Sequence, residues 1–286
     1  MKISPVFRLV LIVAFLVVPL AVASAQIVLS QNLAASVFPV GASAGTRVFY
    51  SLPLYGGPEA GLTGVLWDNA RVEAGINNQL TPAFDDLGVE LFVEPIAVMD
   101  LRVRFARRWV YDTLGFGFIP LPEGGVSAPP AYDGDTFSRN GTVLEITPRV
   151  KAAAGPFVFL NALMFRQVRM DLREGESGWF YEPVSDEPVR SDDWIIQNGT
   201  ILLYTIPTAT DDQVLAGLDN TLLWVTGDEL RRWRISGMFV WATQRVVPGA
   251  EFSLAVLVGG YPRHRAYRLE SGEVYAALQT GLTWRW

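Results

Sequence analysis

The residues with the widest chemical repertoire in this chain are a lone histidine and three pairs of adjacent aspartates. His264 lies in "YPRHRAYRLESG", between Arg263 and Arg265. The aspartate pairs are Asp85-Asp86, Asp192-Asp193 and Asp211-Asp212. A histidine beside a carboxylate and a nucleophile could catalyse hydrolysis. The chain has no Asp-x-His and no serine at a short alternating spacing from His264. We therefore expect a loop histidine, aspartates in turns, and no enzyme.

A further group of acidic side chains falls in the long polar segment 171–192. It contains Glu174, Glu176, Glu182, Asp186 and Glu187. Such a cluster could hold Ca²⁺ or contact lipopolysaccharide through divalent cations. Its spacing matches no recognised ligand set, and the chain has no cysteine that could bind zinc. The sequence therefore predicts a solvated loop, with neither a metal site nor a cofactor.

Elsewhere, charged residues alternate with apolar ones over long stretches. In "MDLRVRFARRWVY", Leu101, Val103 and Phe105 share one face, and Arg102 and Arg104 share the other. Period two over nine or more residues predicts a half-buried β-strand. The alternation places ten charged residues on the polar faces of such strands: Arg71, Glu73, Glu90, Glu94, Arg102, Arg104, Arg108, Arg149, Arg232 and Arg234. Glu145 and Lys151 accompany them.

Eleven segments carry the alternation clearly, and most reach the 9–11 residues that a tilted membrane strand requires. They are 45–54, 69–77, 87–94, 99–111, 142–152, 157–169, 193–206, 214–225, 231–244, 251–260 and 273–286. A single-chain bacterial barrel has an even number of strands. Either the stretch 31–40 adds a strand, or an Asn-Gly turn at 197–200 divides 193–206. We favour an all-β, antiparallel transmembrane barrel of twelve strands, within a range of ten to twelve.

The first 25 residues have the pattern of a secretory signal peptide. Lys2 and Arg8 precede an apolar run, and Ala23 and Ala25 form a small-residue cleavage site. An uncleaved anchor is the alternative, but the run is short for a spanning helix. Residues 26–286 then form one barrel domain, whose net charge falls from −6 to −8 because Lys2 and Arg8 are removed. This acidic balance argues against a nucleic-acid partner.

The mean hydropathy of the chain is positive, although no second long apolar run follows the first. Apolar residues must therefore be distributed along the whole chain. Membrane β-barrels have this property, since only alternate residues face lipid. Aromatic residues near the predicted strand ends would form the two interfacial girdles. They are Tyr50, Trp109, Tyr111, Trp194, Trp224, Trp233, Trp241 and Tyr275. Arg107 is an exception on an apolar face, where it lies near lipid headgroups or a bulge turns it inward.

The last nine residues, "LQTGLTWRW", alternate up to the final position. Leu282, Trp284 and Trp286 share the apolar face. This ending resembles the C-terminal sorting signal of Gram-negative outer-membrane β-barrel proteins, in which the last strand ends on an aromatic residue, usually Phe. No motif of a particular family accompanies it. The resemblance implies location in the cell outer membrane after Sec-dependent export, contact with lipid and lipopolysaccharide, and recognition of Leu282, Trp284 and Trp286 by the barrel-assembly machinery.

With the apolar faces outward, the ten charged residues face the lumen. Neighbouring strands would bring Glu73, Glu90 and Glu94 beside three arginines of "RVRFARR", namely Arg102, Arg104 and Arg108. Opposite charges could pair and fill a narrow barrel, or they could line a pore in which arginine favours anions. We expect a small porin-like channel for small, anionic solutes. The alternative is a non-conducting structural or surface-binding barrel.

Overall fold

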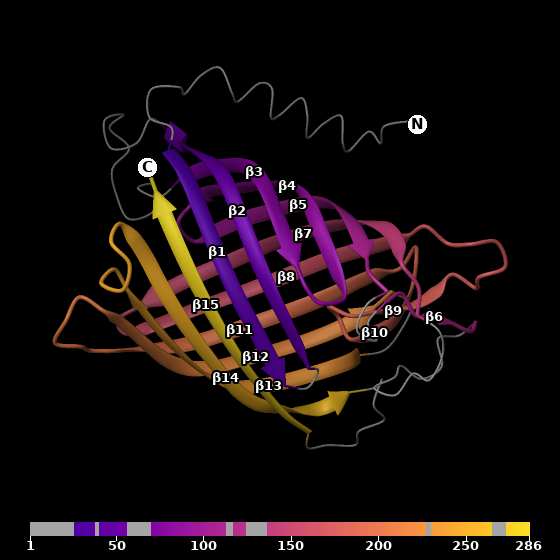
Figure 1. The fold of residues 1–286 in the computed structure, drawn as a ribbon. Coiled ribbons are helices and arrows are strands. Elements are labelled where there is room, and N and C mark those ends of the chain that lie inside the picture. The colour runs from indigo at the N-terminus through magenta and orange to yellow at the C-terminus, as the bar shows by residue number, and fades with distance from the viewer. Residues whose placement is uncertain are drawn as a thin grey trace.

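A computed structural model describes residues 26–37, 40–55, 70–112, 117–123, 136–226, 230–264 and 273–286. The predicted signal peptide lies outside these residues. Within the described ranges, no helix is long and apolar enough to cross a membrane. Fifteen strands are present there, and Figure 1 shows twelve of them wound into one barrel with three short ones at one end.

The twelve long strands pair antiparallel into a closed barrel, each with two neighbours. In order around the ring they are β1 (Gln26–Val37), β15 (Glu273–Arg285), β14 (Ala250–His264), β13 (Leu230–Thr243), β12 (Gln213–Val225), β11 (Trp194–Ile206), β8 (Phe157–Met170), β7 (Arg139–Ala154), β5 (Met99–Val110), β4 (Phe84–Ile96), β3 (Arg71–Leu80) and β2 (Gly41–Pro53). The predicted number of twelve strands is confirmed.

The twelfth strand is β1, which is longer than the stretch 31–40 suggested. The alternative, a turn at the Asn-Gly pair, is wrong: Asn198 and Gly199 lie inside β11 and keep a continuous register with β12. The prediction that Asp85 and Asp86 lie in a turn is also wrong, because both belong to β4. Pairing on two sides holds these polar residues in strands, whatever their preference for turns.

Strand directions define the two ends of the barrel. The end at which β1 starts and β15 finishes is called the terminal end, and the other is called the loop end (Figure 1). At the terminal end, Ile27 and Trp286 exchange two backbone hydrogen bonds of 3.0 Å. These bonds extend the β1–β15 pairing to the last residue, so the chain terminus is part of the seam that closes the barrel.

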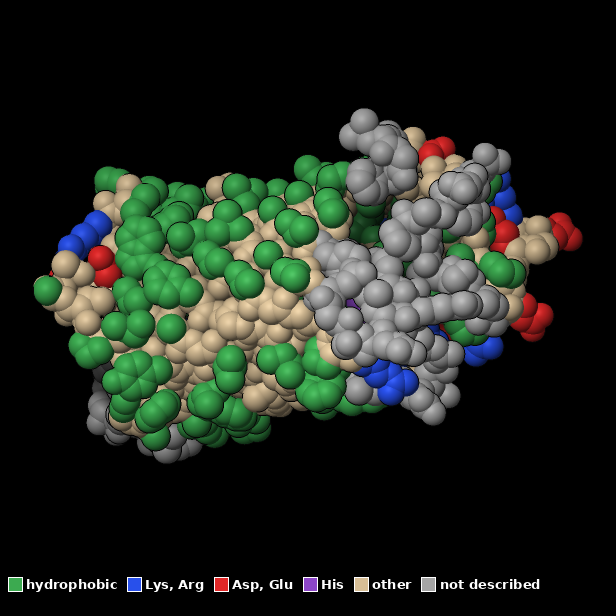
Figure 2. Space-filling model, turned by 90° about the horizontal axis from the view of Figure 1, so that it is seen from below, with side chains coloured by type: hydrophobic (Ala, Val, Ile, Leu, Met, Phe, Trp, Pro, Cys, Tyr) green, Lys and Arg blue, Asp and Glu red, His purple; other side chains and the backbone are tan. Residues whose placement is uncertain are grey.

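The outer wall is apolar between two charged rims. Alternate residues such as Ile76, Val89, Leu218 and Val258 are exposed outward. Figure 2 shows hydrophobic side chains spread over the barrel face in view, with the described Lys, Arg, Asp and Glu side chains gathered toward its two ends. A surface of this kind is stable against lipid and not against water. The strands therefore form a membrane-spanning barrel.

Two sequence expectations about the outer wall can now be resolved. Arg107 stays on the outer face in regular register, three residues before the end of β5, and its Nη2 pairs with Asp171 Oδ2 at 3.0 Å. It therefore lies at the loop-end rim, and no bulge turns it inward. Tyr275 does not belong to a girdle, because it is 6% exposed and packs against Tyr261 inside the barrel.

The three remaining strands form a small antiparallel sheet at the loop end. They are β6 (Pro120–Leu121), β9 (Trp179–Glu182) and β10 (Glu187–Arg190), in the order β10-β9-β6. Strands β9 and β10 form a hairpin, residues 179–190, which is called the plug hairpin below. The prediction that 171–192 is a solvated loop is therefore wrong for the plug hairpin, whose Glu182, Asp186 and Glu187 are buried, whereas most of residues 171–177 are exposed as predicted.

Candidate functional site

The structure places the predicted charged residues at inward-facing positions of β3, β4, β5, β7 and β13. Along β5, for example, Arg104 and Arg108 are buried, whereas Leu101 and Phe105 are exposed outward. The same alternation continues on β4, where Glu90 and Glu94 are buried. Most of these residues form ion pairs across neighbouring strands, so the charges of the wall are arranged in small groups.

The first group is centred on Glu90. Its Oε1 lies 2.8 Å from Arg47 Nη2 and 3.0 Å from Arg102 Nε, so one carboxylate serves two guanidinium groups. Asn77 Nδ2 donates to the other oxygen at 3.3 Å. Register explains this arrangement: β3 and β5 flank β4, and Arg102 lies opposite Phe92, one inward position from Glu90.

The second group joins Glu94 to Asp100 toward the terminal end. Glu94 pairs with Arg71 Nη1 and Lys151 Nζ, both at 2.5 Å. Asp100 pairs with Arg149 Nε at 2.6 Å and with Lys151 at 3.1 Å. Glu73 accepts from Arg71 Nε at 2.7 Å and extends the group onto β3.

Cations and carboxylates in these two groups differ in their access to water. The side chains of Arg47, Arg71, Arg102, Arg149 and Lys151 are 24–33% exposed. Their partners Glu90, Glu94 and Asp100 are only 0–5% exposed. The carboxylates lie against the wall and the cationic groups extend over them. A solute in this part of the lumen therefore meets positive groups first.

A third group lies nearer the loop end and is fully buried. Arg108 makes a bidentate pair with Asp86 at 2.7 and 2.8 Å and reaches Glu182 of the plug hairpin at 2.6 Å. Arg104 Nη2 also approaches Asp86, at 3.4 Å. The expected pairing of these two arginines with the glutamates of β3 and β4 is therefore wrong. Their carboxylate partners are Asp86, which was predicted to lie in a turn, and Glu182, which was predicted to lie in a solvated loop.

The turn of the plug hairpin is stabilised by hydrogen bonds within the hairpin and by hydrogen bonds from the barrel wall. Glu182 accepts from the Ser185 backbone N–H at 2.5 Å and from its hydroxyl at 2.7 Å. Arg232 Nη1 donates to the Ser185 carbonyl at 2.6 Å, and Arg231 Nη1 donates to the Pro188 carbonyl at 2.6 Å. Contacts from β5 and β13, on different sides of the barrel, thus fix the hairpin inside the mouth.

His264 is part of this mouth and does not lie in a loop as predicted. It is the last residue of β14, its side chain is 0% exposed, and its Nε2 lies 3.2 Å from Asp186 Oδ2. A bulge explains its direction: Tyr261 and Pro262 together lie opposite Arg234, which shifts the alternation by one residue. Without this shift, His264 would face lipid.

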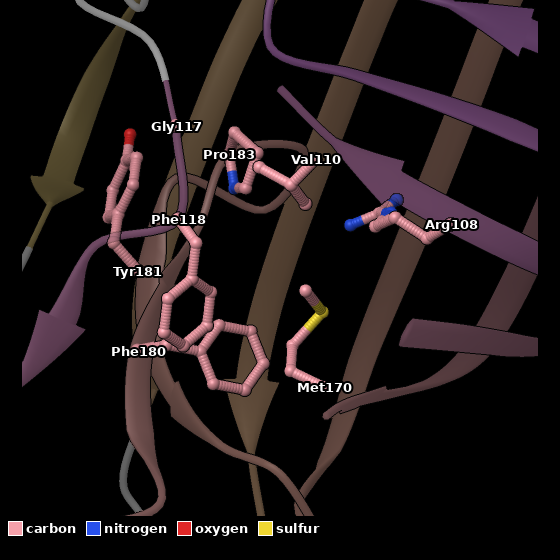
Figure 3. Close-up of a pocket in the computed structure, with 8 residues that line it drawn as sticks. All are labelled: Arg108, Val110, Gly117, Phe118, Met170, Phe180, Tyr181 and Pro183. Atoms are coloured by element: carbon pink, nitrogen blue, oxygen red, sulfur yellow. The ribbon is translucent and has the colours of Figure 1, made fainter. Parts of the chain in front are cut away.

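Apolar packing completes the closure at the loop end. The ring centres of Phe118, just before β6, and Phe180 of β9 lie 5.6 Å apart, and both rings join a core that includes Val143, Val168 and Leu223 of the barrel wall. A cavity of about 10 Å³ remains beside them, with room for about one water molecule. Figure 3 shows its lining, which is Arg108, Val110, Gly117, Phe118, Met170, Phe180, Tyr181 and Pro183.

The segment that leads into the plug hairpin is also tied to the barrel. Arg139 Nη2 donates to Glu176 Oε1 at 2.6 Å, and the Arg173 N–H donates to Oε2 at 2.8 Å. Burial raises the pKa of Glu176, but these donors outweigh it and hold the pKa below its ordinary value. Glu176 therefore stays ionised and keeps the segment attached to β7.

The remaining predicted residue, Arg234, lies on the opposite wall. Its Nη2 donates to Asp219 Oδ1 at 2.8 Å, and its guanidinium lies 4.3 Å from the ring centre of Tyr275. It is therefore separate from the groups on β2 to β7. Sequence reasoning missed Arg47, Asp86, Asp100 and Asp219. Asp100 lies between two apolar residues, and that signal could have identified it. The other three each have a polar neighbour, Thr46, Asp85 or Asn220, which obscures the alternation.

The predicted assembly signal lies at the terminal end of the seam. Trp286 is 64% exposed, and Leu282 and Trp284 point outward on the same face of β15.

Deleting Trp286 removes the two backbone hydrogen bonds to Ile27 and should lower the unfolding free energy by about 1–3 kcal/mol. Trp286→Ala keeps those bonds. We expect it to refold normally in detergent, as judged by heat-modifiable gel mobility, but to insert poorly in cells. Normal insertion of Trp286→Ala in cells would show that the aromatic ring is not read.

No protein-family model and no curated protein matches this chain. Among solved structures, it resembles the NanC porin with 11% identity and a TM-score of 0.41, covering 90% of this chain and 98% of that one. It resembles the KdgM porin with 8% identity and a TM-score of 0.37, covering 91% and 98%. The translocator domain of the autotransporter NalP from Neisseria meningitidis gives 12% identity and a TM-score of 0.40, covering 98% and 94%.

Identities and TM-scores this low carry no information about activity. The class of the protein follows from its own structure. A closed antiparallel barrel with an apolar outer wall is the architecture of outer-membrane β-barrels. The chain is a protein of this class, located in the cell outer membrane.

Proposed function

We propose that the protein is an outer-membrane channel for small anionic solutes, closed at the loop end by the plug hairpin. One observation carries this proposal. In the half of the lumen toward the terminal end, cationic side chains are exposed to water, whereas their carboxylate partners lie buried behind them. Rings of exposed arginine and lysine favour anions in pores. We further propose that lipopolysaccharide surrounds the loop end and that the barrel-assembly machinery inserts the chain.

The contacts of the plug hairpin are compatible with a gate. Arg108, Arg231 and Arg232 hold it by ion pairs and hydrogen bonds, and no covalent bond fixes it because the chain has no cysteine. Segments outside the barrel ring lead into and out of the hairpin. It could thus leave the mouth while all twelve barrel strands stay paired.

The decisive experiment removes the plug hairpin. Residues 179–190 are replaced by a short Gly-Ser linker, and residues 26–286 with and without this change are studied in planar bilayers under asymmetric KCl. We expect low or intermittent conductance for the intact chain. The deletion variant should show steady conductance and a reversal potential that indicates anion preference.

A control separates gating from damage. Ser185→Cys and Arg232→Cys place two thiols across the contact that joins hairpin to wall, at a separation that the arginine side chain now spans. A bis-methanethiosulfonate cross-linker of that length should tether the hairpin and silence the intact chain until a reductant is added. A folded, heat-modifiable deletion variant that conducts nothing would refute the channel.

The apolar core at the loop end favours the second candidate, a non-conducting barrel. Twelve buried apolar residues form one cluster there, from the barrel, the small sheet and Phe118 before it, and this cluster resembles a permanent core more than a hinge. On this hypothesis the hairpin stabilises the barrel, and the segments at the loop end contact surface polymers. Its deletion would then unfold the protein and would not open it.

A further inference from the structure

The apolar outer wall is interrupted by a group of amides and a hydroxyl, called the polar patch here. It consists of Asn161 on β8, Asn198 and Thr200 on β11, and Asn220 on β12. These strands are neighbours, and Thr200 is the register partner of both Asn161 and Asn220. The four residues share the outward face with the exposed Leu202, Tyr204 and Leu218. They therefore point toward lipid and not into the lumen.

The polar patch lies near the middle of the membrane. On the outer face of β11, Asn198 follows Trp194 by four residues, and Thr200 precedes Tyr204 by four. Trp and Tyr mark the two interfaces, so the two polar residues are centred between them. Lipid headgroups do not reach this depth, and acyl chains offer neither donors nor acceptors.

The side chains of the patch satisfy one another only in part. Asn161 and Asn198 exchange two hydrogen bonds of 3.2 Å, and Asn161 Nδ2 also donates to Thr200 Oγ1 at 2.9 Å. Asn220 Oδ1 accepts from Trp233 Nε1 at 2.7 Å. Among the described residues, however, the Asn220 amide nitrogen has no hydrogen-bond partner. The amide and hydroxyl oxygens of Asn161, Asn198 and Thr200 retain further acceptor capacity.

We propose that the polar patch is the interface between two copies of this chain, related by a two-fold axis. The patch is complementary to itself, because unused donors of Asn220 lie on one side of Thr200 and spare acceptors of Asn161 lie on the other. A two-fold rotation about an axis near Thr200 brings the Asn220 side of each copy against the Asn161 side of the other. Interhelical amide pairs in membranes are held in the same way, by hydrogen bonds that lipid cannot replace.

A second copy fits the patch better than the other occupants. Acyl chains would leave the Asn220 amide unpaired, and a headgroup cannot lie at this depth. The patch contains no charged residue, so nothing in it selects a charged partner. The association leaves the lumen and the plug hairpin untouched, and it is therefore independent of the proposed channel.

Cysteine cross-linking tests the proposal directly, because the chain has no cysteine of its own. Residues 26–286 carrying Thr200→Cys are reconstituted in vesicles at a low protein-to-lipid ratio and oxidised with copper-phenanthroline. We expect most of the protein to form a disulfide-linked dimer. Val48→Cys, an outward position on β2 at the opposite wall, should give at least tenfold less. Equal yields from the two positions would overturn the proposal.

A second measurement removes the hydrogen bonds and keeps the fold. Asn161→Leu, Asn198→Leu and Asn220→Leu are combined, and the dimer fraction is measured by single-molecule photobleaching in vesicles. Leucine suits a lipid-facing position, so the variant should fold normally and its dimer fraction should fall at least tenfold. Gln31→Leu is the matched control, since Gln31 is a polar outward residue of β1. An unchanged dimer in the triple variant refutes the interface, and loss of the dimer in the control refutes its two-fold symmetry.

Discussion

Replacing Arg108 by methionine is expected to lower the unfolding free energy of the barrel by about 3–5 kcal/mol. Arg108 is 2% exposed and is shared by Asp86 and Glu182, both fully buried. Its removal leaves two carboxylates close together in a site with little water. Methionine approximates the length of the side chain and can keep the contact with Phe84, whose ring centre lies 4.1 Å from the guanidinium. The loss of stability would therefore report the charge and not a cavity.

Urea unfolding in vesicles, followed by tryptophan fluorescence, measures this change. The matched control is Arg285→Met, since Arg285 pairs with Glu251 at 3.6 Å on the terminal rim and both side chains are about half exposed. An exposed pair contributes about 0–1 kcal/mol, so this variant should remain close to the original protein. Similar losses in both variants would mean that the Arg108 group is not a special anchor. Adding Glu182→Gln to Arg108→Met should recover part of the stability.

The barrel was predictable because its main constraint is local. A strand with lipid on one side must alternate, and the alternation in "MDLRVRFARRWVY" gives β5 and its inward face directly. The strand ends were less predictable. β4 begins at Phe84, whereas the sequence predicted a start at 87. The early start was missed because Asp85 and Asp86 place a polar side chain on each face of the strand. In the same way, β1 begins at Gln26 and has too many small and polar residues to alternate clearly.

The direction of the charged side chains was predictable, and their partners were not. The alternation along β5 places Arg104 and Arg108 inside the barrel, but the register between β4 and β5 determines that both reach Asp86. The plug hairpin left no signal of this kind. Its strands are four residues long, and Glu182 and Glu187 are polar where a buried segment would ordinarily be apolar. Only the arginines that the barrel already holds inside make their burial possible.

His264 shows a third limit of the sequence. Its inward direction depends on one extra residue at Pro262, and a shift of one residue reverses the face of everything that follows. Proline gives a reason for the bulge, since it cannot donate to a neighbouring strand. The sequence contains the cause, but the consequence requires the register on both sides of β14.

Neutralising the exposed cations should reverse the ion selectivity of the opened channel. We combine Arg47→Gln, Arg102→Gln and Arg149→Gln in the variant that lacks the plug hairpin. Glu90 then loses both of its guanidinium partners, and Asp100 keeps only Lys151. The carboxylates become the dominant charges of the lumen. The ratio of anion to cation permeability, obtained from the reversal potential in asymmetric KCl, should fall from above one to below one.

A charge-balanced variant shows whether exposure or net charge sets the selectivity. Glu90→Gln combined with Arg102→Gln removes one charge of each sign and leaves Arg47, Arg71 and Arg149 in the lumen. Because the lost carboxylate was buried and the lost cation was partly exposed, anion preference should weaken but persist. Reversal in this variant would show that Arg102 alone carries the selectivity. No change in either variant would mean that the permeating ions do not pass these side chains, and the lumen charges would then serve only to hold the wall together.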